Sequence, residues 1–153
     1  MDCPWTAEQR SALIGILRQE TDTTAALLSI SQLLQEQLVR FDTEAIEQQV
    51  RKQEALLNHL EQLEKQRCLL LAQALSRPIE QVSTMSLTAL YAYLPHHERV
   101  IVDDIRTRLS TLTTELQRTN SINRMLALRG RNSIQATLNY VRQRNLHAVD
   151  AAL

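Results

Sequence analysis

The chain has 153 residues, the size of one domain, and its 17 Lys and Arg balance its 17 Asp and Glu. It contains two Gly, three Pro and 3% aromatic residues. Sheets need frequent turns and favour β-branched and aromatic residues, so this composition argues strongly against an all-β fold. Two distant glycines also cannot build the phosphate-binding loop of a Rossmann or P-loop enzyme. The abundant Gln, Leu, Arg, Glu and Ala favour long helices.

The first predicted element is a helix over residues 6–40. Apolar or small residues recur there at spacings of three, four or seven, which is the period of a helix with one buried face. Thr6 is a suitable N-cap. The pattern resets near Phe41, and Asp42 or Thr43 can cap a second helix.

The second predicted helix covers residues 43–76 and ends before Pro78, because the residue before a proline is disfavoured in the α conformation. Residues 77–95 form a linker with one short helix, about 86–93, capped by Ser86. A linker of this length is unusual unless it packs on the domain. We expect its apolar side chains to fold back over one end of the bundle: Leu87, Leu90, Tyr91 and Leu94.

A third helix is predicted over 96–147, with Gly130 as a candidate joint because glycine weakens a helix interior. The last residues, 148–153, are expected to fray. Short connections make neighbouring helices antiparallel. The sequence therefore predicts a single all-α domain: an elongated antiparallel three-helix bundle, coiled-coil-like, with a short extra helix in the second connection. No concave pocket is evident in the sequence.

The zero net charge conceals two regions of opposite sign. Residues 1–115 carry 11 Lys and Arg against 16 Asp and Glu, whereas residues 116–153 carry six Arg against one acid, Asp150. An apolar stripe also runs through the basic segment at Ile134, Leu138 and Val141. This pattern suits a docking segment for a partner helix. It equally suits a third helix whose arginines are simply solvated.

Two other functions of the arginines are weaker. Nucleic-acid binding usually adds stacking rings or a recognisable motif, and this segment offers only Tyr140. A membrane-surface helix would need a wider apolar face with Trp or Phe. We therefore expect neither a nucleic-acid partner nor membrane insertion.

The chain lacks a recognisable catalytic or metal-binding pattern. The adjacent His96 and His97 diverge by about 100° on a helix and no Cys or carboxylate completes a zinc spacing. Cys68 lies among leucines, which suggests packing, and no serine stands in a nucleophile elbow. We expect no enzyme activity, no metal and no cofactor. Two cysteines and the lack of a secretory or membrane-spanning segment predict a soluble cytoplasmic protein.

Polar residues on the apolar stripes are more informative. Glu20 and Arg67 lie about 22 and 25 residues from the turn near residue 42, so antiparallel pairing predicts an interhelical ion pair that fixes register. Asn120 and Asn123 lie on the inward face of the third helix. They either form hydrogen bonds between helices or mark where the third helix leaves the bundle.

Several short runs, taken in their order along the chain, are similar to the FlgN-type flagellar export chaperones. The resemblance covers roughly residues 10–145 and also extends to the length and the order of three helices. Its runs are 20–36, which includes Ala26-Leu27-Leu28, then 54–57, 63–67 (Leu-Glu-Lys-Gln-Arg), 87–90 (Leu-Thr-Ala-Leu) and 120–126 (Asn-Ser-Ile-Asn-Arg-Met-Leu).

This resemblance implies a cytoplasmic chaperone that binds the terminal helical segments of hook–filament junction (hook-associated) proteins. Such a chaperone prevents premature assembly and delivers its cargo to the flagellar type III export apparatus. In the family the C-terminal segment is implicated in cargo binding, which corresponds here to residues 120–144. The candidate partner-binding residues are Asn120, Asn123, Leu126, Arg129, Arg131, Ile134, Leu138, Val141, Arg142 and Arg144.

We expect the apolar members of this set to make the contacts and its arginines to steer acidic segments of the cargo. Two alternatives remain open at this point. One is a structural coiled-coil adaptor that self-associates through the same stripe, and the other is a helical nucleic-acid-binding protein. The sequence leaves the oligomeric state open.

Overall fold

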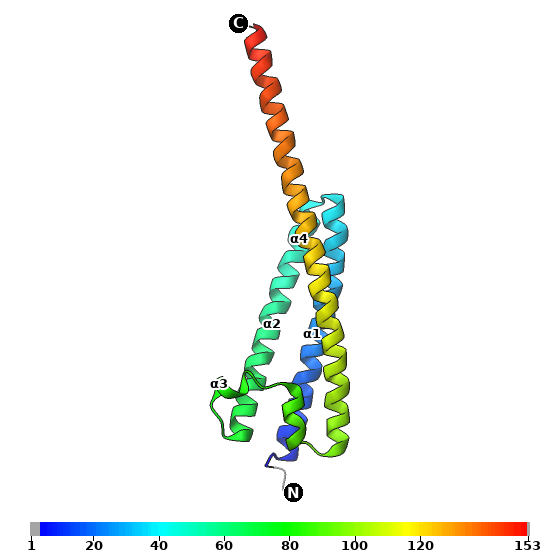
Figure 1. The fold of residues 1–153 in the computed structure, drawn as a ribbon, viewed down its shortest axis with the longest axis vertical. Coiled ribbons are helices and arrows are strands. Elements are labelled where there is room, and N and C mark those ends of the chain that lie inside the picture. The colour runs from blue at the N-terminus through cyan, green and yellow to red at the C-terminus, as the bar shows by residue number, and fades with distance from the viewer. Residues whose placement is uncertain (1–3, 153) are drawn as a thin grey trace.

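A computed structural model describes residues 4–152 of the chain, with the side chains of residues 4–144. Three long helices dominate it: α1 (Ala7–Arg40), α2 (Thr43–Leu75) and α4 (His96–Ala152). Between α2 and α4 lie α3 (Ile79–Val82) and a short 3₁₀ helix, η1 (Leu87–Tyr93) (Figure 1). The described residues contain no strand, so the all-α prediction is confirmed. The linker, however, contains two short helical segments instead of the single one predicted.

The ends of the helices are fixed by local capping. Thr6 accepts a hydrogen bond from the backbone N–H of Gln9, and the Gln9 side chain accepts one from the backbone N–H of Thr6. Asp42 caps α2 through the N–H of Ala45. Phe41 ends α1 with a left-handed φ of 55°, which turns the chain tightly into α2. These contacts make α1 and α2 antiparallel neighbours.

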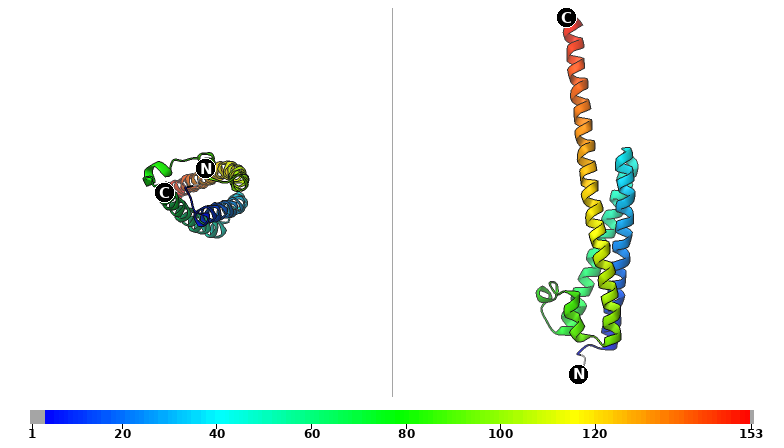
Figure 2. Two further views of the ribbon diagram at one scale, coloured as in Figure 1. Left: turned by 90° about the horizontal axis from the view of Figure 1, so that it is seen from below. Right: turned by 45° about the vertical axis from the view of Figure 1, so that its right-hand side comes forward.

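Helix α1 is the central element, because it packs against both α2 and α4. Among the described residues, no Cα of α2 comes within 8 Å of a Cα of α4. The backbones of the two outer helices are therefore kept apart, and each of them packs on α1. We call the end where residues 41–42 join α1 to α2 the turn end, and the opposite end the linker end. Figure 2 shows the three helices around their common axis and in side view.

The tightly packed core lies at the linker end. There η1 packs against α4 and α3 packs against α2, so the linker occupies the space between the two outer helices. Its Leu90 and Leu94 are buried, as expected, together with core residues from every long helix: Leu13, Leu17, Leu71 and Val102. Trp5 also joins this core and stacks on Tyr93 with ring centroids 5.8 Å apart.

A hydrogen-bonded group holds η1 against α4. The Tyr91 hydroxyl donates to Asp103 Oδ1 at 2.7 Å, and the Arg106 guanidinium donates to the same oxygen at 2.9 and 3.1 Å. These hydrogen bonds, that from Tyr91 first, lower the pKa of the Asp103 carboxyl. The position of Asp103 on α4 is therefore used to fasten the linker.

Helix α4 is one continuous helix that runs far past the turn end (Figure 1). Two expectations thus differ from the structure: Gly130 is not a joint, and the helix extends to Ala152 instead of ending at 147. A Cβ at residue 130 would lie 3.0 Å from Phe41 Cε1, so the glycine allows Phe41 to approach α4 closely. The terminal Leu153, also expected to fray, lies outside the described residues. No described helix is long and apolar enough to span a bilayer.

Candidate partner-binding surface

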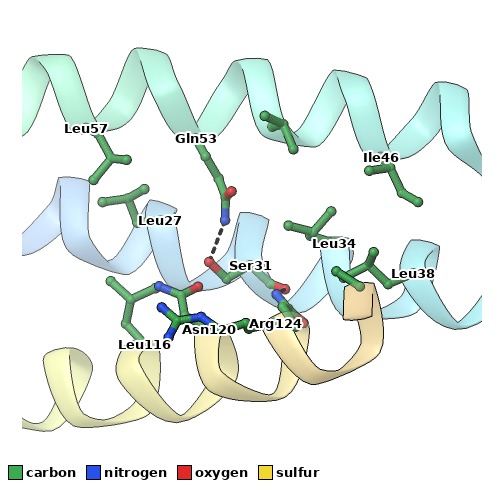
Figure 3. A pocket seen from close by; sticks show the side chains of 13 residues that line it. Leu27, Ser31, Leu34, Leu38, Ile46, Gln53, Leu57, Leu116, Asn120 and Arg124 are labelled. Carbon is green, nitrogen blue, oxygen red and sulfur yellow. Dashed lines mark hydrogen bonds between the residues drawn. The ribbon is translucent and has the colours of Figure 1, made fainter. Parts of the chain in front are cut away.

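An open groove lies at the turn end of the body, where the linker no longer fills the space between α2 and α4. Helix α1 forms its floor and the outer helices form its walls (Figure 3). The hollow has a volume of about 450 Å³. Its lining is mainly apolar, and its members are Leu27, Ser31, Leu34, Leu38, Ile46, Val50, Gln53, Leu57, Leu116, Asn120, Asn123, Arg124 and Ala127. We call this hollow the groove.

Apolar side chains on the α2 wall are left in contact with solvent. Leu57 is 53% exposed and Val50 is 38% exposed, although both belong to the apolar stripe of their helix. On the floor, Leu27 and Leu34 are buried. The groove thus has a well-packed floor and one unpartnered apolar wall, which is the geometry of a site for an amphipathic helix.

Three polar side chains cross the middle of the groove. Gln53 Nε2 of α2 donates to Ser31 Oγ of α1 at 2.8 Å (Figure 3), and Asn123 Nδ2 of α4 donates to the Ser31 carbonyl oxygen at 2.9 Å. Asn123 is 6% exposed, and its Oδ1 has no hydrogen-bond partner in the structure. An acceptor without a partner in a buried position is costly, so this oxygen is a marked feature of the groove.

Two further hollows continue the groove past the turn end along α4. The first is lined by Phe41 and Gly130, shares Leu38, Ile46 and Ala127 with the groove, and includes Leu126 and Arg131. The second shares Phe41 and Ile134 with the first and adds Leu138. A continuous apolar track therefore leads from the body onto the projecting part of α4.

We call residues 131–144, the projecting part of α4 with described side chains, the tail. Each of its side chains is exposed, including the apolar Ile134, Leu138 and Val141. Residues 116–144 contain six arginines and no acidic residue: Arg118, Arg124, Arg129, Arg131, Arg142 and Arg144. The tail is thus a basic amphipathic helix whose apolar stripe has no intramolecular cover.

The structure separates the residues selected from the sequence into three groups. Asn123 is buried in the groove, with Asn120 exposed at its edge. Leu126, Arg131, Ile134 and Leu138 line the two hollows beyond it. The remaining ones, Arg129, Val141, Arg142 and Arg144, are exposed on α4 and line none of these hollows.

The sequence analysis missed the half of the surface that α1 and α2 contribute. Leu27, Leu34 and Leu57 fit the helical periodicity, which predicts an apolar face on each helix but does not say what covers it. The interruption of the stripe by Ser31 and Gln53, opposite each other on antiparallel helices, was the available signal. This interruption can be interpreted as part of a groove only once the separation of α2 from α4 is known.

The structure brings Glu20 and Arg67 together outside the groove. Arg67 Nε donates to both carboxylate oxygens of Glu20, at 3.0 and 3.1 Å, and the Glu20 side chain is almost fully buried. Burial raises the pKa of the Glu20 carboxyl, and the neighbouring Arg67 offsets only part of this effect. A buried charged pair of this kind links α1 to α2 at one fixed height.

The described side chains include no group of three His, Cys, Asp or Glu that could hold a metal ion. Cys68 is a buried core residue with a free thiol.

Long helices that leave an apolar groove and a basic amphipathic extension uncovered have the geometry with which proteins bind amphipathic helices. A family model described as FlgN protein matches residues 1–149, and the chain belongs to the FlgN family. This is a family of flagellar export chaperones and is not known for catalysis, so the suspected family and the chaperone role are confirmed. No curated protein and no solved structure matches the chain.

Proposed function

We propose that this protein is a cytoplasmic chaperone that binds the terminal helical segments of hook–filament junction proteins. It keeps them unassembled and delivers them to the flagellar type III export apparatus. Family membership supports the chaperone role. The particular cargo, its delivery and the cytoplasmic location are our proposals.

The exposed stripe of the tail is the observation that carries this proposal. Ile134, Leu138 and Val141 lie on one face of a helix, and each is about half exposed. Single exposed apolar residues are ordinary, but a continuous uncovered stripe marks an interaction site. Burying such a stripe against a partner is favourable by about 25 cal/mol per Å² of apolar surface, before the cost of ordering the partner.

The same contact explains how assembly is prevented. Axial proteins of the flagellum polymerise through terminal helices, which are uncovered before assembly. A chaperone helix that pairs with such a segment covers the surface that the next subunit would use. The arginines of the tail attract acidic segments and raise the association rate, an effect that decreases as salt screens the charges.

The proposal is tested with the full chain, a purified hook–filament junction protein and isothermal titration calorimetry. Leu138→Asp places a charge on the stripe, and we expect it to weaken binding at least tenfold. Gln143→Asp is the matched control, because residue 143 lies about half a turn around the helix from Ile134 and is also exposed. The control should bind within twofold of the unmodified chain.

Both variants should keep the helix content and unfolding midpoint of the body, because Leu138 contributes nothing to its core. Equal affinity of the two variants would contradict the placement of the site on the tail. If the unmodified chain bound no junction protein and instead showed a mass that increases with concentration, the self-associating adaptor would replace the chaperone proposal.

A further inference from the structure

The groove is the unfilled counterpart of a space that the chain fills for itself at the linker end. There, the linker inserts between α2 and α4 and buries Leu90 and Leu94 in the core. At the turn end the same two helices flank α1, and the residues that line the groove come from these three helices (Figure 3). The η1 segment with its buried leucines is therefore an example, at the linker end, of a short helix that fits between α2 and α4.

The charges of the two walls indicate which charge an occupant needs on the side that faces each wall. The charged residues of the α4 wall and of its extension to residue 144 are all arginines, and one of them, Arg124, lines the groove itself. The facing part of α2 is mixed, and its Glu47 and Arg51 already form an ion pair. An occupant with acidic residues on the side that faces α4 is attracted by the arginines of α4. The arginine-rich tail of a second copy would be repelled by them.

The unpaired Oδ1 of Asn123 adds a specific chemical requirement. This oxygen is an acceptor in a residue that is 6% exposed, and its amide nitrogen is already engaged by the Ser31 carbonyl oxygen. The oxygen has almost no contact with solvent even in the free chain, so water does not satisfy it and only a donor that reaches it from the groove can. An occupant with a hydroxyl, amide or ammonium group at this height would satisfy it.

We propose that the groove binds an amphipathic helix of the exported partner that is acidic along one edge and whose apolar stripe carries one side chain donating a hydrogen bond to Asn123 Oδ1. This inference rests on the proposed function and assigns part of the cargo contact to the body of the chaperone. The α4 wall from Leu116 to Ala127 is about 16 Å long, which accommodates about three helical turns. The apolar track then carries the same partner onto the tail.

The wall is tested by comparing two leucines of α2 in the full chain. Leu57→Asp charges the groove, and Leu69→Asp is the control, since Leu69 has a nearly equal exposure of 51% but lies outside the groove. Titration with the purified junction protein should show at least a tenfold loss of affinity for Leu57→Asp. The control should remain within twofold.

The hydrogen-bond requirement is tested with Asn123→Leu, which removes the acceptor and enlarges the apolar surface. If the partner presents a donor there, the donor becomes buried without an acceptor, and the affinity should fall about tenfold. Unchanged or increased affinity would show that the partner is apolar at this height and would overturn this part. Thermal unfolding followed by circular dichroism establishes that each variant is folded.

The outcomes separate this inference from the proposed function. If the unmodified chain binds the junction protein, Leu138→Asp weakens binding and Leu57→Asp does not, the groove is not part of the site and only the inference fails. If the unmodified chain does not bind the junction protein, both fail. If Leu57→Asp instead abolishes a concentration-dependent mass of the free chain, the occupant is a second copy and the inference is overturned.

Discussion

Two polar residues on the inner face of α1 illustrate opposite uses of polarity in a helical interior. Glu20 is neutralised within the molecule, because Arg67 engages both of its oxygens. Ser31 bridges α2 and α4 but leaves the Asn123 oxygen unpaired at the groove. A buried ion pair whose carboxylate oxygens are both hydrogen-bonded fixes how the helices align. An acceptor without a hydrogen bond beside the groove is a position where a donor from a partner would be stabilising.

The Glu20 pair leads to a prediction about stability and pH. Arg67→Met leaves the buried carboxyl without its partner, so at neutral pH we expect a loss of about 3 kcal/mol in the free energy of unfolding. The pKa of Glu20, already raised by burial, should rise further. The folded variant then binds its proton more tightly than the unfolded chain does. Its stability is therefore greatest below the ordinary Glu pKa and decreases as pH rises through the folded pKa.

Urea unfolding at several pH values between about 4 and about 8 measures this dependence. Lys65→Met is the control, because it breaks the exposed pair with Glu61 on the same helix and should cost less than about 0.5 kcal/mol. A pH-independent loss in Arg67→Met would show that the carboxyl is not the source of the destabilisation.

At the scale of the helices, capping residues determine where each helix begins, and tertiary packing determines what covers its apolar face. The caps at Thr6, Asp42 and Ser86 depend on residues three positions away, so the sequence alone indicated where those helices begin. The height of the Glu20–Arg67 contact also followed from counting outward from a tight turn. Periodicity, in contrast, gives only which face of a helix is apolar.

The groove could not be predicted for this reason. An apolar stripe indicates that a helix face is covered, without stating whether a helix of the same chain or of a partner covers it. Leu57 and Leu71 belong to the same stripe of α2, yet Leu71 is buried in the linker-end core and Leu57 is exposed. The difference depends on the linker, which fills the space between α2 and α4 at one end only. The tail residues were easier to find, because their basic charge distinguished them.

Gly130 provides the prediction at this scale. Gly130→Ala should raise the free energy of unfolding by about 0.5 kcal/mol, because alanine favours a helix by about 1 kcal/mol and part of that gain is lost in moving Phe41. The contact at 3.0 Å is with the outer part of a ring that is 59% exposed, so the ring has room to rotate. Thermal unfolding of the full chain measures the change.

Gly15→Ala is the matched control, since a Cβ there would have nothing within 4 Å. It should show the full gain of about 1 kcal/mol for the same replacement in a long helix. A loss of stability in Gly130→Ala alone would mean that Phe41 is held rigidly against α4.

Across the whole molecule, packing decreases from the linker end to the tail. The fully buried leucines and valines gather at the linker end, the groove lies at the turn end, and the tail has only exposed side chains. Local opening requires less free energy where fewer apolar contacts are lost. The part of the molecule that we propose binds the partner is therefore also its most easily rearranged part.

Hydrogen exchange should reveal this gradient. We expect the slowest amides near Leu17, Leu71 and Val102, faster exchange near Val50 at the groove, and the fastest exchange in the tail. Added junction protein should slow exchange at the groove and the tail while leaving the linker end unchanged. Uniform protection along the free chain would contradict the gradient.

Because α4 is one continuous helix, a small rotation at its anchored end moves its far end by a larger distance. Val102 is anchored in the linker-end core, Asn123 lies about 31 Å further along the helix, and Arg144 about 63 Å from the anchor. Because no Cα of α2 lies within 8 Å of a Cα of α4, the width of the groove depends on the tilt of α4 on α1. Any rotation about the anchored end that widens the groove moves Arg144 by about twice as much. A partner that widened the groove would therefore also shift the tail, which lies well outside the body of the protein.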